Sequence, residues 1–498
     1  MFYQSTRNNK IMVSPSEAVI RGIADDGGLY MFSSNKDIGV DLEKIIKLNY
    51  FDMAKTILLK LLPDYTEEEM EKMVHDAYTD KFETDDITPT VKVGNKYVLE
   101  LFRGPTSAFK DVALSMLPQL LTFAVRKNGT EDDIVILTAT SGDTGKAALE
   151  GFKDVEGTKI IVFYPENGVS DVQKAQMITQ EGKNVAVCAV KGNFDDAQTG
   201  VKIIFGNQDN EKLSETFGAR LSSANSINIG RLAPQVVYYF KSYSDLALSG
   251  EITLGDKVNF CVPTGNFGDV LAGYIALLMG LPVGKLIVAS NANNVLTDFF
   301  ENGEYNKNRP FLKTISPSMD ILISSNLERL LYLATDCNSE EVARYMKDLS
   351  ETGKYKVSDE VFSKIKSVFE AEFCDDSETV KTIGKYYNDY GYLVDTHTAV
   401  ALASYDKYVE ETGDNTPAVV LSTASPYKFC GAVARGIGLS EGETEFETME
   451  KLFERTGVPV PAGLSGLNEK KVLHTKSIEK AEMEDYVLSK VSEKVWKN

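Results

Sequence analysis

The stretch Ile134-Val-Ile-Leu-Thr-Ala-Thr-Ser-Gly-Asp-Thr-Gly-Lys-Ala-Ala-Leu-Glu-Gly-Phe152 decides the fold class. Residues 134–138 are an apolar run of strand length, and residues 146–152 have a helical pattern after a turn rich in Ser, Gly and Thr. A strand that is apolar along its whole length is buried on both faces, as in a parallel sheet covered by helices. The stretch therefore predicts one strand–turn–helix unit of an α/β fold.

The same alternation recurs on both sides of this unit. Further apolar runs of strand length lie at residues 160–164, 185–190, 258–262, 286–289 and 418–421. Helical patterns lie between them at residues 170–179, 197–205 and 270–279, the first of which begins with Ser170 and Gln173 at capping-box spacing. We therefore predict an α/β protein with open, mostly parallel sheets and helices on both faces.

Two regions depart from this alternation. Residues 1–92 carry helical patterns at 16–22, 42–48, 52–62 and 67–78, which predict a mostly helical N-terminal region. Residues 301–389 are dominated by helical patterns rich in Glu and Lys and are predicted to be a helical insertion. The α/β core is then expected at residues 93–300 and 390–498, with a smaller α/β domain at about 112–240.

The composition excludes several classes of function. The chain has 498 residues, of which 43% are hydrophobic and 25% charged, and a formal net charge of -20, so neither nucleic acid nor an anionic membrane is an expected partner. Its five Cys and three His are scattered without the spacing of a metal site. The sequence also has neither a signal-peptide pattern nor an apolar run long enough to span a bilayer. We expect a soluble, cytoplasmic protein without a metal.

One lysine, Lys110, stands at a junction between a strand and a helix. Residues 99–103 end an apolar run, Gly104 and Pro105 break it, and Lys110 follows Phe109 where a helical pattern begins. Desolvation at such a junction disfavours the ammonium form and leaves a nucleophilic amine, as a Schiff-base lysine requires. The alternative is a lysine on the first turn of a surface helix.

Two strand ends lead into loops that suit anions. Residues 140–147 superficially resemble a nucleotide-binding loop, but Thr140 and Ala147 replace the required glycine and hydroxyl residue, so we predict a turn that suits a carboxylate. Residues 263–269, Pro-Thr-Gly-Asn-Phe-Gly-Asp, lie between a strand and a helix and suit a single phosphate. Taken alone, residues 140–147 are better explained as an ordinary capped turn, whereas residues 263–269 are equally consistent with a tight turn without a ligand.

A third strand end leads into Ser422-Thr-Ala-Ser-Pro426, whose hydroxyls can give a neutral hydrogen bond to a heteroaromatic nitrogen. The carboxyl ends of parallel strands meet at one edge of a sheet, so these loops are expected to converge. A reactive lysine, a cradle for one phosphate, an anion turn and a hydroxyl loop together describe a pyridoxal phosphate site.

A series of short motifs runs through most of the chain in a fixed order. They are Ser5-Thr-Arg7, Ala24-Asp-Asp-Gly-Gly-Leu-Tyr30, Gly104-Pro-Thr-Ser-Ala-Phe-Lys-Asp111, Thr138-Ala-Thr-Ser-Gly-Asp-Thr-Gly145, Ala224-Asn-Ser-Ile-Asn228 with Arg231, Pro263-Thr-Gly-Asn-Phe-Gly-Asp269, Ser316-Pro-Ser-Met-Asp320, Asp395-Thr-His-Thr-Ala399 and Ser422-Thr-Ala424. With them the chain resembles the longer, bacterial and fungal branch of the threonine synthase family. That family is similar to tryptophan synthase β and has the fold of the fold type II pyridoxal phosphate enzymes.

The resemblance implies roles for individual residues. Lys110 would be the Schiff-base lysine and the acid/base of catalysis, and Thr423 would face the pyridine nitrogen. The cradle of the cofactor phosphate would comprise Gly265, Asn266, Phe267, Gly268 and Asp269. The substrate α-carboxylate would be bound by Ser141, Gly142, Asp143 and Thr144. The candidates for the substrate phosphate are Asn225, Ser226, Asn228 and Arg231, with a structural salt bridge as the alternative for Arg231.

The reaction implied by the resemblance converts O-phospho-L-homoserine and water into L-threonine and phosphate. The alternatives are a serine/threonine dehydratase-type lyase, which needs no second anion site, and a noncatalytic relative that binds the cofactor. A monomer is expected, with a homodimer as the alternative. One departure from the family pattern is Ser425-Pro-Tyr-Lys428, where His-Pro-Ala-Lys is more common.

Overall fold

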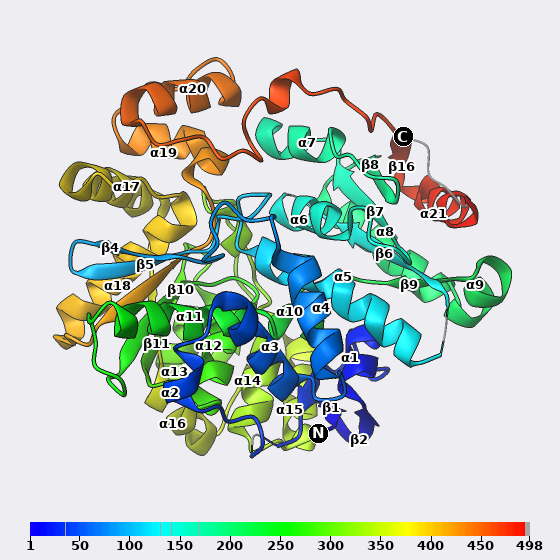
Figure 1. The fold of residues 1–498 in the computed structure, drawn as a ribbon, viewed down its shortest axis with the longest axis horizontal. Helices are drawn as coiled ribbons and strands as arrows, with labels where there is room; N and C mark the ends of the chain where they lie inside the picture. Colours follow the sequence, from blue (N-terminus) through cyan, green and yellow to red (C-terminus); the bar gives the residue numbers. More distant parts are fainter. Residues whose placement is uncertain (35, 130, 141, 168, 494–498) are drawn as a thin grey trace.

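Two sheets that are almost entirely parallel organise the chain, and Figure 1 shows them side by side with helices around both. The computed structural model describes residues 1–34, 36–129, 131–140, 142–167 and 169–493. The larger sheet has six strands, in the order β14 (Phe369–Phe373), β11 (Val283–Ser290), β10 (Val258–Pro263), β15 (Ala418–Ser422), β5 (Lys96–Glu100) and β4 (Thr90–Val93). Only the β4–β5 pair in this sheet is antiparallel.

The six-stranded sheet is covered on both faces, as its continuous apolar strands predict. Val262 and Leu286 belong to the core shared with α12 (Gly268–Leu278) and α13 (Val295–Asn302). Their neighbours Cys261 and Ile287 point to the other face, where α18 (Thr396–Thr412) packs. The predicted α/β class with helices on both faces is therefore confirmed.

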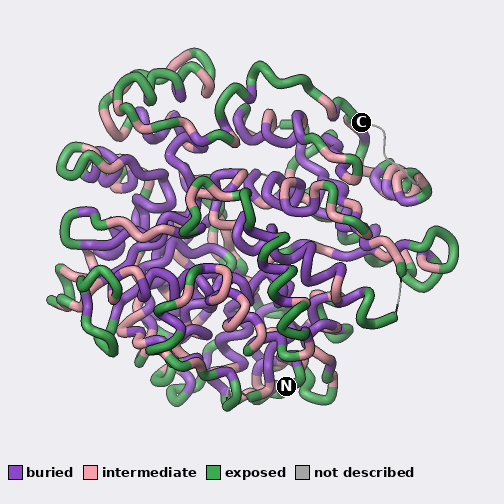
Figure 2. Tube along the Cα trace, viewed as in Figure 1, coloured by how far each residue is buried: buried purple, intermediate pink, exposed green. Residues whose placement is uncertain are grey.

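The smaller sheet has five parallel strands, in the order β16 (Ser477–Glu479), β8 (Val185–Lys191), β7 (Thr158–Pro165), β6 (Asp133–Ala139) and β9 (Ala219–Ser222). One face packs against α6 (Asp143–Phe152), and the other against α8 (Phe194–Asn207) and α21 (Met483–Ser492). Figure 2 shows the strands as buried and the outer helices as partly exposed.

The remaining helices lie around the sheets and in the N-terminal region. In chain order they are α1 (Pro15–Arg21), α2 (Leu42–Ile45), α3 (Tyr50–Leu61), α4 (Glu67–Tyr78), α5 (Lys110–Lys127), α7 (Asp171–Ile178), α9 (Asn210–Phe217), α10 (Ile229–Leu232), α11 (Gln235–Leu248), α14 (Leu327–Ala334), α15 (Ser339–Thr352), α16 (Asp359–Val368), α17 (Asp376–Tyr390), α19 (Cys430–Gly436) and α20 (Glu445–Thr456). Within the described ranges, no helix is both long and apolar enough to cross a membrane.

Three features differ from the sequence-based expectations. The N-terminal region also contains a small antiparallel sheet of β1 (Tyr3–Ser5), β2 (Asn8–Val13) and β3 (Tyr30–Phe32). The segment 301–389 is not only helical, because it supplies β14 and the hairpin of β12 (Glu304–Asn306) with β13 (Lys354–Lys356). The C-terminal strand β16 and helix α21 join the smaller sheet, not the larger one with which residues 390–498 were grouped. These strands are short or carry charged residues, so their apolar signal is weak.

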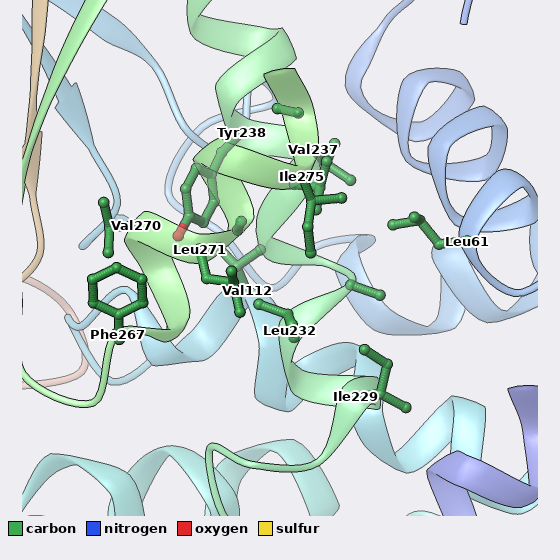
Figure 3. Close-up of a cluster of buried hydrophobic side chains, with 14 of the residues drawn as sticks. Leu61, Val112, Ile229, Leu232, Val237, Tyr238, Phe267, Val270, Leu271 and Ile275 are labelled. Carbon is green, nitrogen blue, oxygen red and sulfur yellow. The ribbon is translucent and has the colours of Figure 1, made fainter. Parts of the chain in front are cut away.

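A continuous buried cluster fixes the helices that begin at the strand ends. Figure 3 shows Val112 on α5, Leu232 on α10 and Val270 and Leu271 on α12 within this cluster, and all four are buried. Close packing leaves little freedom for one helix to shift against another. The first turns of α5 and α12 are therefore held in a fixed relation.

Candidate active site

Lys110 is the first residue of α5, and the loop before it is joined to the loop after β15. The amide of Phe109 donates to the carbonyl of Thr423 at 2.8 Å, and the amide of Ser425 donates to the carbonyl of Ser107 at 3.1 Å. The α5 helix has no side-chain N-cap. A carboxylate near a helix N-terminus is favourable, and α5 carries Asp111 in its first turn.

Asp111 also holds the loop closed before Lys110. Its carboxylate accepts from the amide of Thr106 at 2.8 Å and from the Thr106 hydroxyl at 2.5 Å. Burial raises the pKa of Asp111 to about 6, although these hydrogen bonds lower it. A Cβ added at Gly104 would lie 2.5 Å from the Asp111 side chain, so the turn requires a glycine there.

The amine of Lys110 is largely removed from water. Its side chain is 11% exposed, and Nζ lies 4.0 Å from Oδ2 of Asp143 and 5.0 Å from the ring centroid of Phe109. Burial lowers the pKa of Lys110; the charge of Asp143 opposes this effect, whereas Lys428 and Arg231 lower the pKa further. The desolvation predicted for this lysine is therefore present.

Asp143 lies at the start of α6 and pairs with a second buried lysine. Nζ of Lys428 lies 2.7 Å from Oδ1 of Asp143, and Nε2 of Gln173 donates to the same oxygen at 2.9 Å. Burial favours the neutral acid, but the charges of Lys428 and Lys110 outweigh it and hold the pKa of Asp143 well below its usual range. Asp143 is therefore an ionised carboxylate between two lysines.

The loop from Gly265 to Asp269 forms a cradle at the N-terminus of α12. Phe267 adopts a left-handed conformation with φ of 65°, and a Cβ added at Gly265 would lie 2.6 Å from the carbonyl oxygen of Ser318. Among the residues that the structure describes, none accepts a hydrogen bond from the amides of residues 265–268. Free amides at a helix N-terminus suit a phosphate, so the cradle fits the phosphate of pyridoxal phosphate.

Side chains from another segment hydrogen-bond the carbonyls of this cradle. The hydroxyl of Ser324 donates to the carbonyl of Gly265 at 2.6 Å, and the side-chain amide of Asn326 donates to that of Asn266 at 3.0 Å. Arg329 in turn donates to Oδ1 of Asn326 and to the carbonyl of Tyr30, the latter at 2.9 Å. These contacts connect the N-terminal region to the cradle.

Asp269 is the acidic member of the cradle. It is buried, and one of its carboxylate oxygens accepts from the amide of Val270 at 2.9 Å. Burial raises the pKa of Asp269 to about 7, against the lowering effect of that hydrogen bond and of Lys110. A carboxyl that is partly neutral near pH 7 repels a neighbouring phosphate less than an ionised one.

The turn before α6 also presents amides. The Thr140 hydroxyl accepts from the amides of Gly142 and Gly145, each at 3.0 Å. The amides of Asp143 and Thr144 donate to no other residue in the described part of the chain. Ser141, which was predicted with them, lies outside the described residues. The side chain of Asp143 is paired with Lys428, and its negative charge opposes a substrate carboxylate.

Arg231 is a buried cation that pairs with no carboxylate among the residues that the structure describes. It is 4% exposed, and one guanidinium nitrogen donates to the carbonyl of Ala224 at 2.8 Å. Within the described ranges, Nε of Arg231 has no hydrogen-bond partner and the guanidinium forms no salt bridge. Burial lowers the pKa of Arg231 to about 10. The structure therefore gives no support to the alternative of a salt bridge at this residue.

The other residues predicted near Arg231 differ in their surroundings. Asn225 is exposed and Ser226 is half-buried. Asn228 caps α10 by accepting from the amide of Gly230 at 2.8 Å, and its side-chain amide donates to the carbonyl of Val19 at 2.9 Å. The side chain of Asn228 is thus already engaged in holding α10 against α1.

Three contributors were not predicted from the sequence. Lys428 is fully buried beside Asp143, although it was noted only as part of a departing motif. Gln173 was expected to complete a capping box, but only Ser170 caps α7. The side-chain Nε2 of Gln173 instead donates to Oδ1 of Asp143. Asn326 supports the cradle from a loop that lacks a distinctive motif. A lysine in an otherwise uncharged loop after a buried strand was the signal available for Lys428.

Three family models match the chain in succession. They are described as threonine synthase N terminus, over residues 2–78, pyridoxal-phosphate dependent enzyme, over residues 86–360, and threonine synthase, C-terminal, over residues 398–483. The middle match covers Lys110, the α6 turn and the cradle.

Individual relatives agree with these models. The chain is 37% identical to threonine synthase of Pseudomonas aeruginosa over 91% of its own length and 94% of that protein. It is also 37% identical to threonine synthase-like 1 of Homo sapiens over 94% of its length, but it spans only 63% of that relative. The crystal structure of a PLP-bound threonine synthase from Brucella melitensis matches with a TM-score of 0.87 and 36% identity, covering 99% of this chain and 100% of that one.

Proposed function

Because this chain belongs to the threonine synthase family, we propose that it converts O-phospho-L-homoserine and water into L-threonine and phosphate. The reaction is an elimination of phosphate from Cγ followed by addition of water at Cβ. It would make the protein a carbon–oxygen lyase that acts on a phosphate ester.

Pyridoxal 5'-phosphate is the cofactor of this chain. When bound, it supplies an electron sink that makes protons at Cα and Cβ of the substrate acidic. We propose that Lys110 holds it covalently, that residues 265–269 bind its phosphate and that Thr423, at the carboxyl end of β15, faces its pyridine nitrogen. A neutral hydroxyl at that nitrogen leaves it largely unprotonated.

Lys110 is the proposed acid and base. Burial lowers the pKa of the Lys110 amine, so a larger fraction of it is unprotonated at neutral pH. Only the unprotonated amine can act as a base. We propose that Nζ of Lys110 takes the proton from Cα and then one from Cβ, and returns a proton to Cγ after phosphate has left. Water then adds at Cβ to give the threonine hydroxyl, and a proton returns to Cα to complete L-threonine.

The substrate α-carboxylate is assigned to the start of α6. The amides of Asp143 and Thr144, which have no acceptor in the described part of the chain, and the Thr144 hydroxyl are the groups that we propose to bind it. We leave the Asp143 side chain out of this contact, because its carboxylate is ionised and paired with Lys428.

The buried guanidinium of Arg231 is the observation that most supports a phosphorylated substrate. A buried guanidinium without a counter-ion is costly unless an anion binds to it. Arg231 lies near enough to Lys110 to influence its pKa, and it lies on helix α10, apart from the loop of the cofactor cradle. A second anion site of this kind suits a substrate with its own phosphate and is not required by a dehydratase.

A product assay tests the proposal. The cofactor-loaded protein is incubated with O-phospho-L-homoserine, and phosphate and threonine are quantified together. Equal amounts of the two are expected. Formation of ammonia and a keto acid from threonine, with no phosphate from O-phosphohomoserine, would identify a dehydratase. Absence of both reactions, despite cofactor binding, would identify a noncatalytic relative.

A further inference from the structure

Lys428 contacts two segments that are distant from it in the sequence, and together the three segments lie next to both sheets. It lies in the short helical turn η2 (Pro426–Phe429), which follows β15 of the six-stranded sheet. Its Nζ lies 2.7 Å from Oδ1 of Asp143, at the start of α6 beside the five-stranded sheet, and donates to the carbonyl of Thr106 at 2.9 Å. Thr106 belongs to the loop that leads to Lys110.

The side chain of Lys428 has no exposed surface, and that of Asp143 is 3% exposed. Removing two charges from water is costly, so a buried ion pair of this kind adds little net stability and is often retained for specificity. Asp143 uses its other oxygen toward Lys110, with Oδ2 at 4.0 Å from Nζ. One carboxylate is therefore shared by two lysines with different surroundings.

We propose that Lys428 is a positioning residue of the cofactor site, which holds Asp143 oriented toward Lys110 and thereby sets the protonation of the Lys110 nitrogen. The inference rests on Lys110 being the cofactor lysine of the proposed function. Neither the substrate nor the reaction type enters the argument, so it can be tested apart from turnover.

The direction of the effect follows from the charges around Lys110. The groups that act on it are Asp143 from α6, Lys428 from η2, Arg231 from α10 and Asp269 from α12. Asp143 favours the protonated form of the Lys110 nitrogen, whereas Lys428 opposes that form directly and also neutralises Asp143. Loss of the Lys428 charge should therefore make the Lys110 nitrogen more basic.

The test uses the absorbance of protein-bound pyridoxal phosphate, titrated with pH in the absence of substrate. Lys428→Gln keeps hydrogen-bond donors toward Asp143 and Thr106 but removes the charge. We expect its absorbance midpoint to rise by about one pH unit or more. Lys428→Arg keeps the charge, and its midpoint should stay within about 0.3 unit of the unmodified protein.

Lys146→Met is the matched control. Lys146 is also on α6 and nearly buried, but it pairs with Glu150 at 3.0 Å and lines a separate cavity of about 390 Å³ behind Gly104 and Pro105. Its removal should leave the midpoint unchanged. A shift in the control as large as that in Lys428→Gln would overturn the inference. It would show that the loss of any nearby positive charge, and not the contact of Lys428 with Asp143, moves the midpoint.

A double variant keeps the test valid if Lys428→Gln does not fold. Asp143→Asn combined with Lys428→Gln leaves no uncompensated buried ion, and its midpoint should lie at or below that of the unmodified protein. A midpoint above it, or an unshifted midpoint in folded Lys428→Gln, would contradict the role of Lys428. A shifted midpoint in a protein that makes no threonine would uphold that role and reject the proposed reaction.

Discussion

Lys110 lies among charged side chains of both signs. One ionised carboxylate, Asp143, faces it at 4.0 Å, and the cations Lys428 and Arg231 act against the ammonium form. Burial adds to the effect of these cations, so the amine loses its proton more easily than an exposed lysine. A residue that must both accept and return protons is well served by a pKa nearer to neutrality.

Replacement of this lysine tests its assignment. Lys110→Ala removes the amine that we propose to bind the cofactor and to move the protons, so turnover should fall by at least about a thousandfold and the absorbance of the covalently bound cofactor should disappear. The measurement combines steady-state kinetics with a spectrum and circular dichroism. Retained activity in a folded variant would exclude Lys110 as the catalytic base.

Arg231 makes a different prediction. Arg231→Gln should raise the KM for O-phosphohomoserine by roughly tenfold to a hundredfold, because the variant lacks the charged hydrogen bond that we propose to the substrate phosphate. The dissociation constant for pyridoxal phosphate should not change, since the cofactor cradle is a different segment at the start of α12. A weakened affinity for the cofactor with an unchanged KM would show that Arg231 acts on the cofactor instead.

The raised pKa of Asp269 leads us to expect that the stability of the protein depends on pH. Its pKa is raised by burial from 3.8 to about 7, so the folded state binds its proton more tightly than the unfolded state. The stabilisation from this group is complete below about pH 4 and is lost as the pH rises toward 7.

Asp269→Asn removes this titration and keeps an oxygen for the Val270 amide. In cofactor-free protein, the melting temperature of the variant relative to the unmodified chain should increase by roughly 3 °C or more between pH 5 and pH 8. Thermal unfolding followed at several pH values measures the difference. If the difference does not change with pH, Asp269 does not titrate in this range.

At the scale of the elements, the site is built from loops at the carboxyl ends of parallel strands. The loop after β10 presents amides at the start of α12, and the loop after β6 presents them at the start of α6. The Gly265 conformation and its contact with Ser318 leave no room for a side chain in the first of these loops.

Gly265→Ala should therefore weaken cofactor binding. The added Cβ would lie 2.6 Å from the Ser318 carbonyl oxygen, so the loop must move, and we expect the dissociation constant for pyridoxal phosphate to rise by about tenfold or more. Gly206→Ala on α8 is the control, since a Cβ there meets no atom within 4 Å. Equal affinities in the two variants would argue against the cradle.

Many of the strands, and the loops that follow them, could be predicted from the sequence. Strands such as β6 and β10 are apolar throughout because both faces are buried, and the loops that follow them carry the Gly and Thr that open amides require. The strands β1, β12 and β16 have three residues each, too few for a periodic signal. The pairing of Lys428 with Asp143 depends on two segments 285 residues apart in sequence, and no local pattern encodes it.

At the scale of the whole molecule, the chain passes between the two sheets several times, and segments next to both sheets contribute residues to the site. Helix α5 leads from the larger sheet to the smaller one, and α10 and α11 lead back toward β10. Figure 1 shows the C-terminal segment crossing from α20 to α21, where β16 joins the smaller sheet. In this segment a Cβ at Gly463 would lie 2.1 Å from the carbonyl oxygen of Pro105, so the crossing chain closes against the loop that carries Lys110.

In the proposed reaction, phosphate leaves by cleavage of the carbon–oxygen bond and water enters at Cβ. Turnover of O-phospho-L-homoserine in water enriched in oxygen-18 tests it most directly, with both products analysed by mass spectrometry. The proposed reaction predicts threonine that carries one oxygen-18 atom and phosphate that carries none. Labelled phosphate together with unlabelled homoserine would show cleavage of the phosphorus–oxygen bond and contradict the account.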